Sequence, residues 1–318
     1  MRDAVFSAQG LTKAYKGSAV LDGVSFALER GKVYGLAGLK GSGKTTVLKL
    51  MAGIAAKDSG ELRFFGEEPP ASVEARGKVG YMIDGPVFSE TMNVRKNLEM
   101  VRLLKKVGNR ERVGELMDML ELSGEGNTDQ LVFRQQLGVR QKLGIAAALM
   151  SDPELVLLDD AAGGIDPAYK SAFGSLLVKL TSENSQGRPS KTVLITGSRL
   201  TDMIGYCDEL FFLDKGKIAA HETRKSILDR CDIRYSINTV SSEAAEQTLK
   251  KLFSPGEYQI TSEESFDILS PRVTEAELRR MLEINGVLVK SMQKQGISIE
   301  EFYHGIVDAG IVGGGENA

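Results

Sequence analysis

Residues 38–45, Gly38-Leu39-Lys40-Gly41-Ser42-Gly43-Lys44-Thr45, decide the fold of this chain, because they match the phosphate-loop pattern G-x-x-x-x-G-K-[ST]. The apolar run 32–37 before the loop is typical of a short buried strand, and the run 46–52 after it is typical of a helix that ends at Gly53. This order predicts backbone N–H groups that converge on phosphate oxygens at the helix start. The alternative is a structural glycine turn, and the flanking strand and helix argue against it.

Two side chains of the loop predict how a nucleotide is bound. Lys44 would reach the β- and γ-phosphates, and the hydroxyl of Thr45 would bind Mg²⁺. The predicted nucleotide-binding residues of this region are Gly38, Leu39, Lys40, Gly41, Ser42, Gly43, Lys44, Thr45 and Thr46.

Other stretches accompany the loop in a fixed order. A buried-strand pattern at 155–158 ends in Asp159 and Asp160. The remaining stretches are residues 11–15 and 21–26 before the loop, and residues 78–86, 137–146, 164–167, 192–200 and 207–218 after it. Together with the loop they resemble the nucleotide-binding subunit of ABC transporters over roughly residues 4–220. The resemblance implies an α/β P-loop NTPase fold of ABC type with a helical subdomain, and ATP and Mg²⁺ as cofactors.

The resemblance also assigns roles to residues outside the loop. It places Tyr15 against the adenine ring, whereas the strand pattern alone favours a half-buried tyrosine. It makes Asp159 the residue that holds Mg²⁺ through water. It places Gln136 and Gly138 at the start of the family's signature helix, which contacts the γ-phosphate across a dimer.

Four of the implied catalytic or sensing positions depart from the family pattern. Asp84 replaces a glutamine that touches Mg²⁺ and the attacking water, and its carboxylate is still a candidate metal ligand. Gln136 replaces the signature serine, and Ser198 replaces a histidine and carries no charge near pH 7. Asp160 replaces a glutamate that acts as a base, and the missing methylene pulls the carboxylate back by roughly 1.5 Å. The candidate catalytic residues are thus Asp160, Asp84 and Ser198, and we expect ATP binding with slow or partner-dependent hydrolysis.

The composition narrows the class of function. The formal net charge is −3 and the pI is ≈ 5.7, which argues against nucleic acid as a partner. Cys207 and Cys231 lack metal-ligand spacing and are typical of reduced thiols in a cytosolic setting. No apolar run approaches the ~20 residues that span a bilayer. A transport pathway would therefore lie in a separate transmembrane permease subunit, with this chain peripheral on the cytoplasmic face of the cell membrane.

The sequence predicts two domains and a tail. Residues 1–222 form the predicted nucleotide-binding domain, with a helical subdomain at about 84–150. Residues 223–312 carry strand and helix patterns in the order β-α-β-β-α-β plus a final helix, which predicts a small ferredoxin-like α+β domain. Thr274 and Ser298 are the predicted caps of its last two helices. Residues 313–318 are predicted to form a flexible tail.

The C-terminal extension resembles that of ATPases of the bacitracin and lantibiotic export and immunity type. This resemblance favours a dimerisation or regulatory role, and a stabilising appendage is the alternative.

Two functions from different classes fit these observations. The first is an ATPase subunit that dimerises and drives a membrane subunit exporting a peptide, an antibiotic or another amphipathic compound. The second is a catalytically inactive, nucleotide-gated regulatory subunit that pairs with a competent ATPase. The second ATP-binding subunit is either a copy of this chain or a more competent paralogue. A soluble ABC protein of translation or DNA repair is disfavoured, because the chain has one cassette and no heptad run between its motifs.

Overall fold

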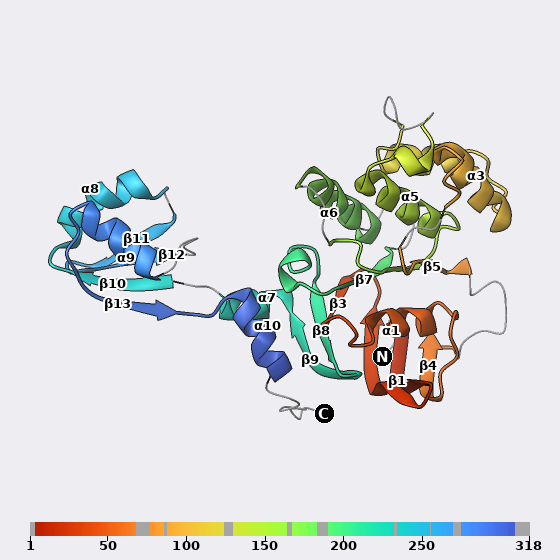
Figure 1. The fold of residues 1–318 in the computed structure, drawn as a ribbon, viewed down its shortest axis with the longest axis horizontal. Coiled ribbons are helices and arrows are strands. Elements are labelled where there is room, and N and C mark those ends of the chain that lie inside the picture. Colours follow the sequence, from red (N-terminus) through yellow and green to blue (C-terminus); the bar gives the residue numbers. More distant parts are fainter. Residues whose placement is uncertain are drawn as a thin grey trace. The chain divides into compact units, whose positions relative to one another are not determined.

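A computed structural model of the chain describes residues 4–67, 77–85, 88–123, 130–163, 167–182, 190–231, 234–254, 256–269 and 275–308. These residues fall into two units, with the boundary between Arg224 and Lys225, and each unit is described by itself (Figure 1).

A mixed sheet forms the centre of the first unit. Its strands, in spatial order, are β5 (Val79–Met82), β6 (Leu155–Leu158), β7 (Thr192–Gly197), β3 (Val33–Ala37), β8 (Glu209–Asp214) and β9 (Lys217–Thr223). The first five run parallel, and β9 is antiparallel to β8. Every residue of β3, β6 and β7 is buried, as expected for the central strands of a parallel sheet. Because parallel strands end at one edge, the segments that follow β3, β5, β6 and β7 lie close together.

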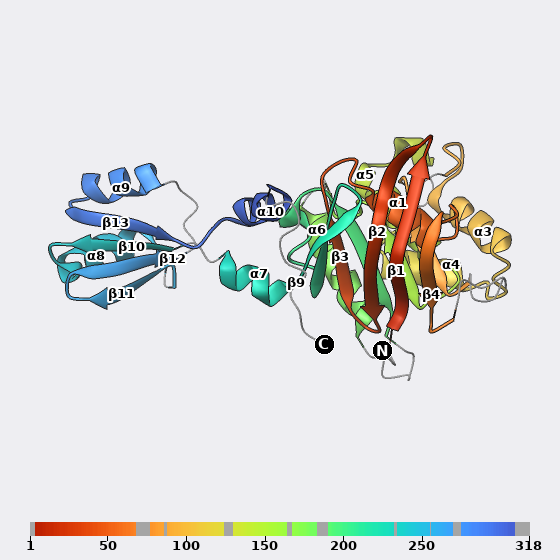
Figure 2. The ribbon, with the colours of Figure 1, turned by 90° about the horizontal axis from the view of Figure 1, so that it is seen from below.

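An antiparallel sheet lies beside the phosphate-loop helix α1 (Lys44–Met51) and shares its core. Its strands follow one another as β2 (Ser18–Glu29), β1 (Ala4–Tyr15) and β4 (Ser59–Phe64), which Figure 2 shows side by side. Phe6 of β1 packs against Phe26 and Phe64 with ring centroids 5.3 and 5.1 Å apart. Leu48 of α1 and Leu36 of β3 belong to the same buried cluster. This cluster holds α1 between the two sheets.

The described residues of the first unit also form the helices α3 (Val94–Leu104), α4 (Arg112–Met119), α5 (Leu137–Leu149) and α6 (Pro167–Thr181). Helices α3, α4 and α5 pack on one another, and α5 also packs on β5 and β6. The side chain of Asn93 caps α3 by accepting a hydrogen bond from the backbone of Lys96 at 2.9 Å. Short 3₁₀ turns lie at Val132–Arg134 and Leu200–Asp202 in the described part of this unit. In the part of the chain that the structure describes, no helix is long and apolar enough to cross a membrane.

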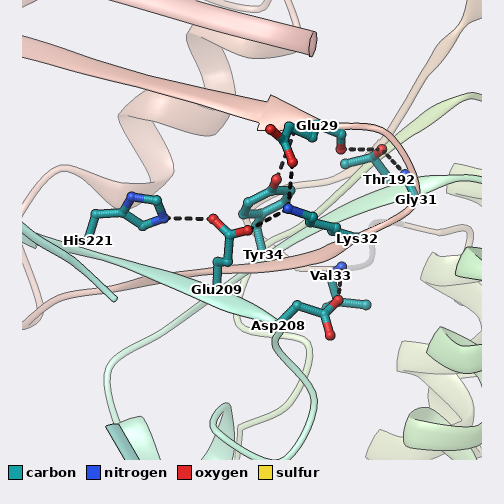
Figure 3. A network of polar contacts seen from close by, with 9 residues as sticks. All are labelled: Glu29, Gly31, Lys32, Val33, Tyr34, Thr192, Asp208, Glu209 and His221. Atoms are coloured by element: carbon teal, nitrogen blue, oxygen red, sulfur yellow. Dashed lines mark hydrogen bonds and ion pairs between the residues drawn. The ribbon is translucent and has the colours of Figure 1, made fainter. Parts of the chain in front are cut away.

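A polar network fastens β3 to its neighbours at the edge of the sheet opposite the phosphate loop (Figure 3). The ammonium of Lys32 donates to the carboxylates of Glu29 and, at 2.7 Å, Glu209. The second oxygen of Glu209 lies 2.8 Å from Nε2 of His221 on β9. Charged groups thereby tie the segment before β3 to β8, which begins 177 residues after Lys32, and to its neighbour β9. The hydroxyl of Thr192 adds a hydrogen bond to the carbonyl of Glu29 at 3.0 Å.

The second unit is a four-stranded antiparallel sheet covered by helices. Its elements are β10 (Arg234–Thr239), α8 (Ser242–Leu252), β11 (Tyr258–Ser262), β12 (Ser265–Leu269), α9 (Glu275–Ile284), β13 (Val289–Gln295) and α10 (Ile299–Asp308). The spatial strand order is β11-β12-β10-β13. This is the β-α-β-β-α-β arrangement that the sequence predicts, and its core includes Ile237, Leu249 and Phe266.

The structure adds a helix at the start of this region and confirms a predicted helix cap near its end. Helix α7 (Arg224–Arg230) was not predicted, because its seven residues are too short for a clear amphipathic pattern. At α10 the predicted cap is confirmed: Ser298 Oγ accepts from the backbone of Glu301 at 3.0 Å, and the Glu301 carboxylate accepts from the backbone of Ser298 at 2.7 Å. The predicted cap Thr274, the loop residues 164–166 and the tail 313–318 lie outside the described residues.

Candidate functional site

The phosphate loop runs from the end of β3 to the start of α1 and leaves no room for side chains at key glycines. Gly43 adopts a left-handed φ of 110°, and a Cβ there would lie 3.0 Å from the carbonyl oxygen of Val20 and 2.7 Å from Leu21. A Cβ on Gly38 would lie 2.5 Å from the carbonyl oxygen of Leu213. The loop is therefore bounded on one side by protein backbone, and its shape depends on glycine. Leu39, Lys40 and Gly41 are exposed, Ser42 and Gly43 are buried, and Lys44, Thr45 and Thr46 are half-buried.

The Lys44 ammonium folds back over the loop. It donates to the carbonyl oxygens of Gly38 at 2.7 Å and Leu39 at 3.0 Å. Burial lowers the pKa of Lys44, and the negative charges of Asp159 and Asp160 oppose that shift. The amine is thus held at the loop by weak neutral acceptors, which phosphate oxygens can replace with stronger charge-assisted bonds.

Two threonines hold the two carboxylate oxygens of Asp159 at the end of β6. The Thr45 hydroxyl donates to Oδ2 at 2.9 Å, and the Thr196 hydroxyl donates to Oδ1 at 2.5 Å. The Thr196 hydroxyl also accepts from the backbone N–H of Asp160 at 3.0 Å. Sequence reasoning missed Thr196, although a hydroxyl at the end of an apolar strand was a usable signal: the residue is 1% exposed and sits on β7, beside β6.

Asp160 has an unusual backbone and a perturbed carboxyl group. Its φ is 50°, in the left-handed region that aspartate tolerates better than most residues. Loss of hydration and then the charge of Asp159 raise its pKa, against the effect of Lys44. A Cβ on Gly163 would lie 2.8 Å from Oδ1 of Asp160, so the carboxylate points toward that glycine. Ser198 follows β7 directly and is exposed, and its side chain makes no hydrogen bond to another described residue.

Asp84 reaches the same cluster from the end of β5. Its φ is 59°, and its backbone N–H lies 3.5 Å from Oδ2 of Asp159. Its carboxylate forms an ion pair with Lys49 of α1, with Nζ and Oδ2 2.6 Å apart. Asp84 as a Mg²⁺ ligand stays a prediction, and Lys49 is a participant that the sequence motifs did not reveal.

The other predicted residues lie at two separate places. Tyr15, at the end of β1, is 44% exposed, and Lys13 Nζ lies 5.3 Å from its ring centroid. Gln136 is exposed at the N-cap position of α5 and makes no side-chain capping bond, and Gly138 is half-buried in the first turn. Within the described ranges, no hydrogen bond joins Gln136 or Gly138 to the phosphate loop. The roles of Tyr15, Gln136 and Gly138 stay predictions.

The donor set suits Mg²⁺ bound together with a nucleotide. Thr45 and Asp159 offer hard oxygen ligands 2.9 Å apart, at the point where the phosphate loop meets β6. Among the described residues no group of three or more His, Cys, Asp or Glu side chains could hold a metal ion by itself. Mg²⁺ commonly relies on one or two protein oxygens together with water and substrate phosphates, so this sparse donor set fits it.

The chain is similar in sequence to known transport ATPases. The sequence pattern of the ABC transporter family matches residues 21–163. The bacitracin transport ATP-binding protein BcrA of Enterococcus faecalis is 27% identical over 309 residues, which cover 96% of this chain and 97% of the relative. The lantibiotic transport ATP-binding protein SrtF of Streptococcus pyogenes is 30% identical over 211 residues, which cover 66% of this chain and 87% of the relative.

A solved structure shows the same fold. It is a dimeric ATP-binding cassette in a post-hydrolysis state bound to ADP and Pi. It superposes with a TM-score of 0.61 at 22% sequence identity, covering 69% of this chain and 98% of the cassette.

Proposed function

The chain belongs to the ATP-binding proteins of ABC transporters, and we propose that it binds MgATP at its phosphate loop, dimerises, and drives or gates a separate transmembrane subunit, with weak or partner-dependent hydrolysis. The observation that carries the proposal is the hydrogen bond of 2.9 Å between Thr45 Oγ1 and Asp159 Oδ2. It brings the phosphate loop and the acidic end of β6 together beside Lys44.

Each residue of this cluster has a distinct task in nucleotide binding. Lys44 would exchange the carbonyls of Gly38 and Leu39 for phosphate oxygens. Thr45 and Asp159 would hold Mg²⁺, which offsets the charge of the phosphates when it is bound. Tyr15, exposed at the end of β1, is available to stack on the adenine ring.

The residues at the catalytic positions argue for slow hydrolysis of ATP. The carboxylate of Asp160 is one methylene shorter than the family's glutamate, and Ser198 cannot carry the charge of the family's histidine near pH 7. In a head-to-tail dimer, Gln136 and Gly138 would face the nucleotide of the second subunit. Asp160 and Ser198, in place of the family's glutamate and histidine, also favour the second candidate function, a regulatory subunit paired with a competent ATPase.

The named activities of two relatives suggest the cargo. One is a bacitracin transport protein and the other a lantibiotic transport protein. We therefore assign this chain to export of a peptide, an antibiotic or another amphipathic compound, from the cytoplasmic face of the cell membrane. The partners are a transmembrane permease and a second ATP-binding subunit, and the net charge of −3 argues against nucleic acid.

The deciding experiment is equilibrium binding of a fluorescent ATP analogue, with Mg²⁺ present, to the full chain and to two lysine variants. Lys44→Ala should abolish binding, because it removes the ammonium that faces the phosphates. Lys96→Ala, on the exposed face of α3, is the matched control and should bind like the unmodified chain. Undiminished affinity in Lys44→Ala would overturn the proposed site.

A further inference from the structure

Lys49 lies at the nucleotide site but outside the phosphate-loop pattern. It is four residues after Thr45 on α1, so the two side chains lie on the same face of the helix. Its side chain is 32% exposed, and its ammonium pairs with Asp84 across 2.6 Å. Lys49 is thus a second cation, after Lys44, within the field of the acidic cluster.

The ion pair closes a ring of contacts around the cluster. Oδ2 of Asp159 lies 2.9 Å from Thr45 Oγ1 and 3.5 Å from the backbone N of Asp84. The left-handed backbone of Asp84 lets its N–H face Asp159 while its carboxylate faces Lys49. Helix α1 then connects Lys49 back to Thr45. The segment after β5 is therefore attached to the phosphate-loop helix through one side chain and to Asp159 through one backbone group.

Electrostatics explain why this attachment matters for a polyanionic ligand. Asp84 follows β5, and Asp159 and Asp160 follow the neighbouring strand β6, at the end of the sheet where the phosphates are proposed to bind. A carboxylate in place of the family's neutral amide adds a charge that repels the phosphates. Lys49 neutralises that added charge and draws the carboxylate onto α1.

We propose that Lys49 is a positioning residue of the nucleotide site, which holds the carboxylate of Asp84 on α1 and thereby keeps a repulsive charge away from the phosphates. This inference rests on the proposed function, because it assumes that MgATP binds at the loop. It also explains how the chain tolerates aspartate at position 84.

The test is MgATP binding to Lys49→Met, Asp84→Asn and the double variant, with Lys49→Arg as the charge-preserving control. Lys49→Met should weaken binding about fivefold to tenfold, the size expected for one uncompensated charge at a partly exposed site. Lys49→Arg should retain affinity, and Asp84→Asn is the background with which the double variant is compared. The double variant should recover most of the loss, since both charges are then absent. The deficit of Lys49→Met should shrink at high salt, which loss of helix packing would not produce.

The outcomes separate three readings. If Lys49→Met binds like the unmodified chain, Lys49 has no positioning role and the inference is wrong. If the double variant stays as weak as Lys49→Met, Lys49 contacts the nucleotide directly and the route through Asp84 is wrong. If the unmodified chain itself fails to bind MgATP, or Lys44→Ala binds normally, it is the proposed function that fails.

Discussion

The hydroxyl of Thr196, on the strand next to β6, donates a hydrogen bond of 2.5 Å to Oδ1 of Asp159. The same hydroxyl accepts the backbone N–H of Asp160 at 3.0 Å, so one buried side chain orients both acidic residues. Thr45 holds the other oxygen of Asp159 from the phosphate loop. The acidic end of β6 is thus fixed from two sides by hydroxyl groups of the protein itself.

Thr196→Val tests this arrangement with little change of volume. The substitution leaves the Asp160 N–H and one oxygen of Asp159 without their partner, so the free energy of unfolding should fall by about 1–3 kcal/mol. The Mg²⁺ concentration needed for half-maximal ATP binding should rise. Urea unfolding and a Mg²⁺ titration measure these effects, and Thr196→Ser is the control because it keeps the hydroxyl. A loss in Thr196→Ser with none in Thr196→Val would mean that packing of the methyl group, not the hydrogen bonds, carries the effect.

Gly43→Ala should disrupt the phosphate loop. The added Cβ meets the carbonyl of Val20 at 3.0 Å and the side chain of Leu21 at 2.7 Å, at a φ of 110° that alanine rarely adopts. We expect loss of ATP binding and a fall in unfolding free energy of about 1–3 kcal/mol. Gly114→Ala is the matched control, since a Cβ in that half-buried helical position meets nothing within 4 Å. Normal ATP binding by Gly43→Ala would show that the loop shape is not required.

Restoring the family's hydrolytic residues should raise turnover. Asp160→Glu together with Ser198→His should increase ATP hydrolysis at least about tenfold, because a correctly placed base contributes more than that to such reactions. Steady-state phosphate release from the purified chain is the measurement, and Asp229→Glu on the surface of α7 is the control. Rapid turnover by the unmodified chain, unchanged in the double variant, would mean that Asp160 already suffices.

Glu209 should make stability depend on acid pH. Partial burial raises the pKa of Glu209, but the hydrogen bonds from Lys32 and His221 outweigh it and leave the pKa below its usual 4.5. A lowered folded-state pKa means that this stabilisation is full above about pH 4.5 and is lost as the pH falls through the folded value. In the same network Lys32 also donates to the Glu29 carboxylate, and the Tyr34 hydroxyl accepts from the backbone N–H of Glu29 (Figure 3).

The variant Glu209→Gln isolates this contribution. It should lower the unfolding free energy at pH 7 by about 1 kcal/mol and flatten the stability profile below about pH 4.5. Urea unfolding as a function of pH measures both effects, with Glu67→Gln on an exposed turn as the control. A profile as steep as that of the unmodified chain would assign the acid sensitivity to other carboxylates.

Local patterns predicted much of the fold. The apolar run ending at Ala37 is a buried strand, the glycine loop leads into α1, and the alternation around Tyr235 and Ile237 is β10. The capping pair Ser298 and Glu301 likewise lies within four residues of sequence. Such features are readable because the groups that interact are neighbours along the chain. Helix α7 was not predicted from the sequence because its seven residues carry only one buried side chain, Ile227.

What the sequence by itself determined is the phosphate loop, the class of fold and the inventory of acidic residues, since each depends on residue type and local spacing. Only the tertiary structure decided that Thr196 binds Asp159 and that Lys49 binds Asp84, because these partners lie 37 and 35 positions apart and meet only through the order of the sheet. Strands β5, β6, β7 and β3 end at one edge, and α1 starts there, so their terminal side chains converge. No local pattern specifies that order; burial of the central strands on both faces does.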